Sequence, residues 1–391
     1  MPKTDRPTAA PSQRSAVEPF HAMDVLARAN RMRAAGVDVI SLAVGQPFAP
    51  APKAAVKATR RFLEHGRVAY TDALGRTDLR QRLSRHYAEH YGCEVPVERI
   101  AVTTGSSAGF NLAFLAAFDV GDRIAIAAPG YPAYRNIIRA LGLIPVEIEV
   151  DASEGYVLHA DHLAASHAKT PLQGVLVASP ANPTGTVTPE AELERLIAFA
   201  EDAGIRFISD EIYHNLTYAK SEVTALSFSH APIVVNSFSK FYCMTGWRIG
   251  WMVLPPELVR PAERIGQSLY ISAPELSQIA AMAALDAADD LVAVREGYVR
   301  NRAFLIEHLP KLGFRDIAPI DGGFYAYATV PDDAGDSAVF AASILDDCGV
   351  AITPGIDFDL RRGHRTVRLS YACDHASLVE AVRRMEARPN R

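Results

Sequence analysis

Short apolar runs alternate with longer amphipathic segments between residues 100 and 254, and this alternation constrains the fold more than any other feature. Runs with so few polar interruptions are typical of parallel strands that are buried on both faces. They are IAVT (100–103), RIAIA (123–127), PVEIEV (145–150), GVLVAS (174–179), RFISD (206–210), IVVNS (233–237) and IGWMVL (249–254). The clearest helix pattern fills residues 189–203, where Thr188 can cap the first turn and Gly204 ends the helix. The sequence therefore predicts an α/β fold with a mainly parallel central sheet.

The pattern changes after about residue 290. A helix is predicted over 294–309, and the segment GGFYAYATV (322–330) alternates like a half-exposed strand. A helix over 337–348, the short runs VAIT and TVRLSYA, and a last helix over 377–387 follow. This part of the chain predicts a smaller α+β domain. Residues 1–18, rich in Pro, Ser and Thr, are expected to form a flexible N-terminal arm.

Composition excludes several classes of protein. A net charge of −5 leaves no basic excess for binding nucleic acid or an acidic membrane surface. The longest apolar runs fall short of the roughly 18 residues that a membrane helix needs. Four scattered cysteines without a CxxC pair favour a reduced, cytoplasmic protein, and no metal site is expected. Cys243 is interpreted as a packed neighbour of Lys240, because no histidine motif beside it suggests a nucleophilic thiolate.

Polar residues follow several of these runs, at the strand ends where an open α/β sheet binds its ligands. Lys240 comes just after IVVNS, and Arg248 follows eight residues later. A lone lysine at a strand end is usually solvated. Phe241, Met244 and Trp247 can partly desolvate this one, and Arg248 adds positive charge. Both effects lower the pKa of an amine and make it a nucleophile.

Asp210 ends the run RFISD, where a carboxylate either caps a helix or needs a cationic partner if it is buried. A protonated pyridine nitrogen would serve as that partner, which is the pairing that makes pyridoxal phosphate an electron sink. Tyr213 and Asn182 could both bond the phenolic oxygen of the ring. The alternatives are a core tyrosine and a turn residue of the NPTG segment.

The segment TTGSSAGF places Gly105, Ser106 and Ser107 at the start of an apolar helix, where free N–H groups can hold a phosphate. This is a weak signal alone, because helix starts often carry serine. Further donors and one candidate for stacking on the ring are Ser237, Ser239, Arg248 and Tyr131. In TVRLSYA, alternation places Arg368 opposite Val367 and Leu369. It is either a surface charge or a clamp for a carboxylate.

These motifs together resemble the class I and II pyridoxal-phosphate aminotransferases of fold type I, the aspartate aminotransferase-like fold. The matching segments run in family order over nearly all of the chain after residue 40. They are SLAVGQP, AYTDALGRTDLR, TTGSS, PGYPAY, ASPANPTG, SDEIYH, SFSKFYCMTGWRIGW, GGFYAY and TVRLSYA. The resemblance implies a large cofactor-binding domain over 45–290. Residues 19–44 and 291–391 are expected to form the small domain.

The resemblance also implies roles for the candidate residues. Lys240 would form the Schiff base and shuttle the proton, while Asp210 pairs with the pyridine nitrogen and Tyr213 and Asn182 bond the phenolic oxygen. Phosphate would be held by Ser106, Ser107, Ser237, Ser239 and Arg248, with Tyr131 on the ring face. Arg368 and Asn182 would hold the substrate carboxylate near Gly45. Tyr70 would reach the phosphate of a partner subunit, so that the active unit is a homodimer.

One departure bears on substrate choice. A subgroup specific for dicarboxylates has a second arginine near the position where this chain has Ser268. The expected pocket wall consists of uncharged aromatic residues, namely Phe20, Tyr270, Phe324 and the Tyr70 of a second copy. We therefore expect an L-amino acid with a neutral aliphatic or aromatic side chain as donor and a 2-oxo acid as acceptor, in a ping-pong reaction. The alternatives are a carbon–sulfur β-lyase or a decarboxylase on the same fold and, more remotely, a ligand-sensing regulator.

Overall fold

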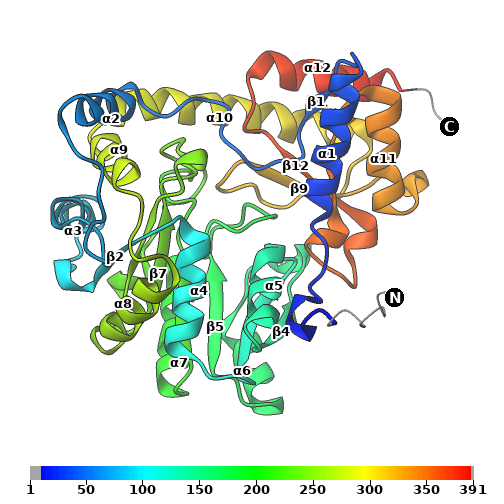
Figure 1. Ribbon diagram of the computed structural model, residues 1–391. Helices are drawn as coiled ribbons and strands as arrows, with labels where there is room; N and C mark the ends of the chain where they lie inside the picture. The colour runs from blue at the N-terminus through cyan, green and yellow to red at the C-terminus, as the bar shows by residue number, and fades with distance from the viewer. Residues whose placement is uncertain (1–9, 389–391) are drawn as a thin grey trace, which may run out of the picture.

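The computed structural model describes residues 10–388, apart from the side chains of Ala288 and Asp289. Residues 1–9 of the expected N-terminal arm lie outside the described residues. A seven-stranded sheet forms the centre of the larger part of the molecule (Figure 1). In spatial order its strands are β2 (Ile100–Thr103), β8 (Gly250–Val253), β7 (Ile233–Ser237), β6 (Arg206–Asp210), β5 (Gly174–Ala178), β3 (Arg123–Ala128) and β4 (Ile144–Glu149).

The prediction of a mainly parallel sheet is confirmed. Strands β7, β6, β5, β3 and β4 pair in parallel, whereas β8 runs antiparallel to both of its neighbours, β2 and β7. Along β5, Val175 and Val177 pack into one buried apolar cluster and Leu176 into another. Both faces of the sheet are therefore buried, as the nearly continuous apolar runs predict.

Helices cover the two faces of this sheet. Helices α4 (Ser106–Ala117), α5 (Pro132–Ala140) and α8 (Pro256–Tyr270) contribute to the cluster that contains Leu176. The cluster on the other face takes side chains from α2 (Lys53–His65), α3 (Thr77–Tyr91), α6 (Ala160–Lys169), α7 (Glu190–Asp202) and α9 (Glu275–Leu285). Helix α7 begins one residue later than predicted, because Pro189 rather than Thr188 is the residue before its first turn.

The smaller part of the molecule is built on a three-stranded antiparallel sheet in the order β11 (Thr353–Pro354), β12 (Thr366–Ser370), β9 (Tyr325–Thr329). Two short parallel strands, β1 (Ile40–Ser41) and β10 (Val350–Ala351), lie beside it. The helices are α1 (His21–Ala34), α10 (Ala288–His308), α11 (Ser337–Cys348) and α12 (His375–Glu386). Strand β9 is buried from Tyr325 to Ala328, so the prediction of a half-exposed strand is wrong here. Other elements cover both of its faces.

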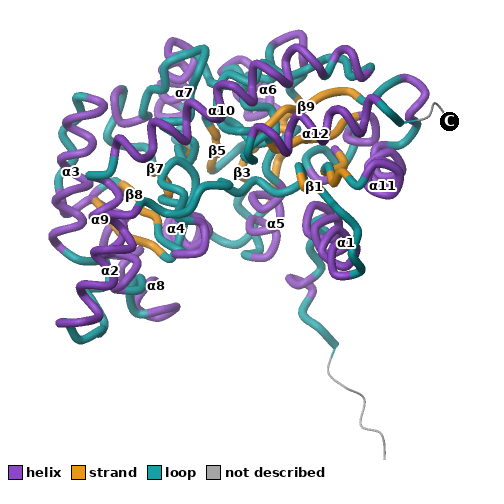
Figure 2. Tube along the Cα trace, turned by 90° about the horizontal axis from the view of Figure 1, so that it is seen from above, coloured by secondary structure: helices purple, strands orange, loops and turns teal. Residues whose placement is uncertain are grey.

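The long helix α10 spans both parts of the molecule, and the N-terminal segment with α1 lies on the smaller part. In Figure 1, α10 extends from the side of α2 to the side of α12, and Figure 2 shows it lying across the top of the molecule. Because α10 is continuous from residue 288, the expected domain boundary at 290/291 falls inside its first turn. Helix α1 lies next to α11 and makes contacts with β10 and β11. In the described residues no helix is long and apolar enough to span a bilayer.

Candidate active site

A cavity of about 230 Å³ collects most of the predicted site residues. Its walls come from the carboxyl ends of the parallel strands, from the first turns of α1 and α4, and from β9 and β12 of the small sheet. The described residues that line it are Phe20, Ala22, Met23, Val44, Gly45, Ser106, Ser107, Phe110, Tyr131, Ala133, Tyr134, Ile137, Asn182, Ile212, Tyr213, Ser239, Lys240, Thr245, Arg248, Tyr325 and Arg368. The cavity thus contains three cationic side chains, Lys240, Arg248 and Arg368.

The amine of Lys240 is fixed at the cavity wall. Its Nζ donates a hydrogen bond of 2.8 Å to the carbonyl oxygen of Gly45, and it lies 5.5 Å from the centre of the Tyr213 ring and 5.7 Å from that of Phe324. Burial lowers the pKa of the amine, and Arg368 and Arg248 lower it further, against the opposing effects of Tyr325 and Asp210. A lowered pKa leaves more of the amine as the nucleophilic free base.

Of the residues that sequence reasoning placed around Lys240, Met244 is fully buried in the core of the large sheet and Trp247 packs against that core. Phe241 packs against the same core and also against the cluster that contains Tyr213 and Phe324. The rings over the amine come from Tyr213 and Phe324, which are distant in sequence. Cys243 is buried, and burial raises the pKa of its thiol to about 12, which is consistent with a packed side chain and not with a thiolate nucleophile.

Asp210 lies at the end of β6 with only 2% of its surface exposed. The hydroxyl of Tyr134 donates a hydrogen bond to its carboxylate, and the backbone N–H of Ile212 donates a second at 3.1 Å. Burial nevertheless raises the pKa of Asp210 to about 7. A carboxylate in this position requires either a proton or a cationic partner, and a pyridinium nitrogen satisfies that requirement.

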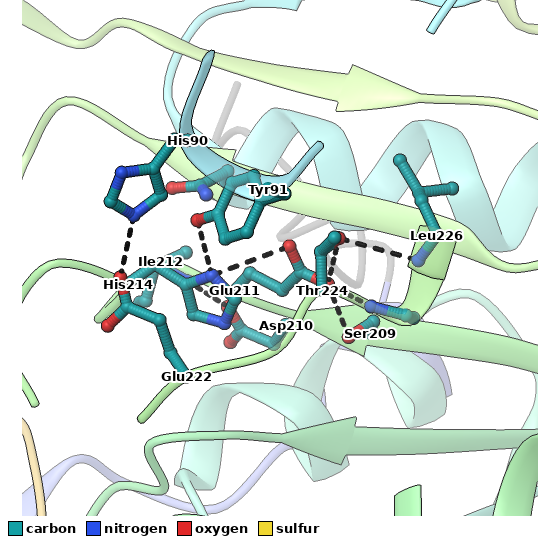
Figure 3. Close-up of polar contacts among 12 residues, drawn as sticks. His90, Tyr91, Ser209, Asp210, Glu211, Ile212, His214, Glu222, Thr224 and Leu226 are labelled. Carbon is teal, nitrogen blue, oxygen red and sulfur yellow. Dashed lines mark hydrogen bonds and ion pairs between the residues drawn. The ribbon is translucent and has the colours of Figure 1, made fainter. Parts of the chain in front are cut away.

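A buried polar network fixes the chain just after Asp210 (Figure 3). One carboxylate oxygen of Glu211 accepts hydrogen bonds from the Ser209 hydroxyl at 3.1 Å, the Thr224 hydroxyl at 3.0 Å and the backbone N–H of Ala225 at 2.9 Å. Its other oxygen lies 3.7 Å from Nδ1 of His214, which also contacts the hydroxyl of Tyr91 at 2.7 Å. With most of its polar atoms satisfied, this network gives Asp210 a rigid support.

Tyr213 and Asn182 both line the cavity, as the sequence suggested. The hydroxyl of Tyr213 lies 2.8 Å from the hydroxyl of Tyr325, and the side-chain oxygen of Asn182 accepts a hydrogen bond of 3.0 Å from Arg368. Burial holds the pKa of the Tyr213 phenol well above its usual value, so its hydroxyl keeps its proton and can donate to an oxygen in the cavity.

The first turn of α4 and Arg248 form a cradle for an anion. Gly105 precedes α4 with a φ of +77°, and no side chain caps the helix. A Cβ atom at Gly105 would lie 2.5 Å from Nη2 of Arg248, so only glycine allows the guanidinium to lie against the helix start. Arg248 forms no ion pair with any described carboxylate, and its Nη1 donates to the Thr245 carbonyl oxygen at 3.0 Å. Free N–H groups beside an unpaired arginine suit a phosphate.

The predicted serines divide into two groups around this cradle. Ser106, Ser107 and Ser239 line the cavity. Ser237 is buried behind them, where its hydroxyl accepts a hydrogen bond of 3.0 Å from the backbone N–H of Ser239. Ser237 therefore orders the loop that carries the other donors and does not face the cavity itself.

Arg368 presents a second unpaired cation to the cavity. It is 4% exposed, and its guanidinium donates to Asn182, to the carbonyl oxygen of Ala43 and to the hydroxyl of Thr353. The rings of Tyr325 and Phe358 lie 4.4 and 4.7 Å from its central carbon. Its Nε has no partner, and none of the ion pairs within residues 10–388 involves it. A buried unpaired guanidinium fits a substrate carboxylate.

The remaining predicted residues are placed in different surroundings. Phe20 and Tyr131 line the cavity with their ring centres 5.9 Å apart. Phe324 is fully buried behind the cavity wall, and Tyr270 packs against the core between the large sheet and helices α4, α5 and α8. Tyr70 is 79% exposed and lies outside the cavity of its own chain. Ser268 is exposed on α8, where its hydroxyl donates to the Arg264 carbonyl oxygen.

Sequence reasoning missed two tyrosines of the site. Tyr134 contacts Asp210, and Tyr325 contacts Tyr213 and the Arg368 guanidinium. Tyr134 lies in the first turn of α5 and follows Tyr131, the residue before that helix, by three positions, a spacing that could have suggested that the two rings lie close together. Tyr325 lies close to Gly45, where a Cβ atom would be 1.6 Å from the tyrosine hydroxyl, and no local pattern signals such a long-range contact.

Comparison with known proteins identifies the family. Residues 37–385 match the family model for aminotransferase class I and II. A valine–pyruvate aminotransferase of Mycobacterium tuberculosis is 44% identical over 377 residues, which cover 95% of this chain and 96% of that protein. The chain therefore belongs to the class I and II aminotransferases, with the aspartate aminotransferase-like fold, and is a transaminase.

Solved structures agree in fold. An aminotransferase from Mycobacterium tuberculosis has a TM-score of 0.94 at 43% identity, and the match covers 96% of this chain and 98% of that one. The aspartate aminotransferase of Thermus thermophilus, solved with maleate, has a TM-score of 0.91 at 31% identity over 96% of this chain and 98% of that one.

Proposed function

We propose that this transaminase uses pyridoxal 5'-phosphate and moves the α-amino group of a neutral L-amino acid to a 2-oxo acid in a ping-pong reaction. The observation that carries the proposal is the set of unpaired charges in one cavity. Among the described residues Arg248, Arg368 and Asp210 form no ion pair, and Asp210 is buried. A ligand with a phosphate, a protonated ring nitrogen and a substrate carboxylate would neutralise all three.

The residues present fit this cofactor. Ser106, Ser107, Ser239 and Arg248 would hold its phosphate, Asp210 the ring nitrogen, Tyr213 and Asn182 the phenolic oxygen, and Tyr131 the ring face. When bound, pyridoxal phosphate supplies an aldehyde that takes up the amino group and a ring that withdraws electrons.

Three side chains of this protein would carry out the remaining work. Arg368 binds the α-carboxylate of the donor and orients its α-carbon. The Nζ of Lys240, released as a free amine, removes the proton from that carbon, which its lowered pKa favours. The negative charge of Asp210 keeps the ring nitrogen protonated, so that electron withdrawal is sustained.

The side-chain end of the cavity favours a neutral donor. Its wall includes Phe20, Ala22, Met23, Val44 and Ile137. Arg28, Arg31, Arg361 and Arg362 are the arginines that could bring a basic group to this end, and three of the four have a carboxylate partner outside the cavity. Arg28 binds Asp346, Arg361 binds Glu149 and Arg362 binds Asp359. An aliphatic side chain would gain about 1.5–3 kcal/mol from burial here. An unpaired second carboxylate would cost several kcal/mol. The relative that is 44% identical is named for valine and pyruvate.

The test is a screen of donors with pyruvate as the common acceptor. We expect kcat/KM for valine, alanine or phenylalanine to exceed that for aspartate, and a clear preference for aspartate would contradict the proposal. Without any acceptor, a transaminase should form 2-oxo acid only in an amount equal to its active sites. Continuing turnover under that condition would instead indicate a β-lyase or a decarboxylase.

We further propose that two chains share their active sites. Tyr70 is 79% exposed on a loop outside its own cavity, as expected if it reaches the phosphate cradle of a partner. Subunits carrying Tyr70→Phe can be mixed with subunits carrying Lys240→Ala. In the mixed dimer, a Tyr70 that acts on the partner places both defects in one site and leaves the other site intact, which retains native turnover. Full activity of a monomer at low concentration would contradict sharing. A cytoplasmic location remains a prediction.

A further inference from the structure

Helix α1 begins at the wall of the substrate cavity. Phe20 precedes the helix, and Phe20, Ala22 and Met23 all line the cavity. The first N–H groups of a helix have no partner within the helix, and together with the helix dipole they attract anions. Phe20 offers no side-chain hydrogen bond to them. Without a partner, the N–H groups at this helix start would form an anion site at the end of the cavity where we expect the donor side chain to lie.

A carboxylate from the far end of the chain occupies these N–H groups. One oxygen of Asp357 accepts a hydrogen bond of 2.8 Å from the backbone N–H of His21, and the other accepts one of 2.7 Å from that of Ala22. Asp357 is buried, and no ion pair within residues 10–388 involves it. Burial raises the pKa of this carboxyl, and the two N–H groups, the His21 side chain and Arg368 oppose that rise. Its charge therefore acts on the start of α1 and also on the Arg368 guanidinium.

Asp357 is held in place from several sides. The Arg135 guanidinium donates to its carbonyl oxygen at 3.3 Å, and the N–H of Gly130 donates to the carbonyl oxygen of Phe358 at 3.0 Å. The ring of Phe358 lies against the guanidinium of Arg368. Asp357 is thus fixed relative to the clamp for the substrate carboxylate and relative to the loop that carries Tyr131.

The two helix starts at this cavity are opposite in character. Helix α4 begins at a glycine without a side-chain cap and beside the unpaired Arg248, which attracts an anion. Helix α1 begins against a carboxylate that neutralises its positive end. We propose that Asp357 is a specificity-determining residue, which makes the side-chain end of the cavity reject a second carboxylate and so favours neutral donors. This inference rests on the proposed function, because it assumes that the donor side chain points from Arg368 toward α1.

The experiment compares two inhibitors of the holoenzyme that differ at one end. Succinate and isovalerate can each place a carboxylate on Arg368. Succinate then directs its second carboxylate toward α1, whereas isovalerate directs an isopropyl group toward it. In Asp357→Asn the charge is lost while one acceptor remains. We expect the inhibition constant of succinate to fall about tenfold relative to that of isovalerate, because a charge at a helix end affects the binding of a second charge there. The ratio of kcat/KM for aspartate over valine should rise by a similar factor.

Asp374→Asn is the matched control. Asp374 caps α12, where it accepts the backbone N–H of Ser377 at 2.8 Å, and it does not line the cavity. The same substitution there should leave the ratio of the two inhibition constants unchanged. If Asp357→Asn does not fold, Asp357→Ser provides a second uncharged variant that keeps one acceptor.

The proposal is overturned if a folded Asp357 variant binds both inhibitors with equally altered affinity, since that would show a purely structural role. An unchanged ratio would overturn it as well. The donor preference of the unsubstituted enzyme is measured separately, so that a wild-type preference for aspartate would count against the proposed function. The shift in ratio between wild type and variant would still decide the role of Asp357.

Discussion

Arg248 and Arg368 line the same cavity, but they are held there by different means. Arg248 has an exposed side chain with one hydrogen bond within the chain, and its backbone adopts a left-handed φ of 51°. Arg368 lies in a regular strand, and its guanidinium is fixed by three acceptors and two aromatic rings. The first arginine is aimed by its backbone and the second by its side-chain contacts.

The two anion sites therefore depend on different structural features and should be sensitive to different substitutions. A left-handed backbone costs of order 1–3 kcal/mol at a residue other than glycine, and neighbouring structure must hold it. That structure includes the pairing of Ser237 with Gly250 on both sides of the loop. The site at Arg368 depends instead on the shape of the guanidinium, because its planar fork reaches several acceptors at once.

Removing the amine of Lys240 should have the largest effect, and it separates binding from chemistry. In Lys240→Ala both arginines remain, so phosphate and carboxylate should still bind. Turnover should fall by several orders of magnitude, because in the proposed function covalent linkage and proton transfer both depend on Nζ. Stopped-flow and steady-state assays measure the loss, and equilibrium dialysis measures the binding that remains. A variant with near-native turnover would refute the assignment.

Asp210 is the acidic counterpart of the two arginines. Its ionisation in the folded protein can be tested through the pH dependence of the free energy of unfolding. In the cofactor-free protein its pKa is raised to about 7, above the ordinary value of 3.8. The folded state therefore holds the proton more tightly, and the contribution of this group to stability is lost as pH rises from about 4 to 7. The loss should reach as much as ~4 kcal/mol.

Urea unfolding of the cofactor-free protein at pH 5 and pH 8 measures the part of this loss that falls above pH 5, which is about 2.7 kcal/mol. In Asp210→Asn the same pair of measurements should differ by clearly less. Identical pH profiles for the two proteins would mean that the carboxyl is not buried without a cation in solution.

Arg368→Lys should then distinguish the two arginines. A lysine cannot replace the fork that reaches Asn182, Ala43 and Thr353, and it leaves buried acceptors without partners. We expect kcat/KM for the donor to fall at least about a hundredfold, which corresponds to roughly 3 kcal/mol. The affinity for cofactor, measured by its absorbance during titration, should stay near that of the wild type. If Arg368→Lys lowered the cofactor affinity as strongly as kcat/KM for the donor, the proposal of two separate anion sites would be contradicted.

Arg248→Lys should have the smallest effect. A lysine can replace the exposed Arg248 side chain as a cation and loses only the bidentate contact with the phosphate. That contact is worth about 1–3 kcal/mol. Cofactor affinity should weaken by about tenfold, while kcat at saturating cofactor changes little. If this substitution proves more damaging than Arg368→Lys, the proposed contrast between the two arginines is wrong.

Much of the fold could be predicted because the strands are buried on both faces, which leaves runs such as GVLVAS without polar breaks. The direction of β8 could not, since a fully buried strand has the same composition in either direction. The burial of β9 depends on elements that cover it from elsewhere in the chain. Strand-end residues such as Asp210 followed from the sheet, whereas Tyr325 and Asp357 act through contacts that only the folded chain creates.

The antiparallel β8 has a consequence for the order in which the site is assembled during synthesis. Because β8 returns directly beside β7, the loop with Lys240 and Arg248 is closed by a local pairing, which costs little chain entropy. All seven strands of the large sheet have been synthesised once Val253 is made. Arg368 is added 115 residues after Val253. A nascent chain can therefore complete the proposed phosphate cradle before the arginine proposed to bind the substrate carboxylate exists.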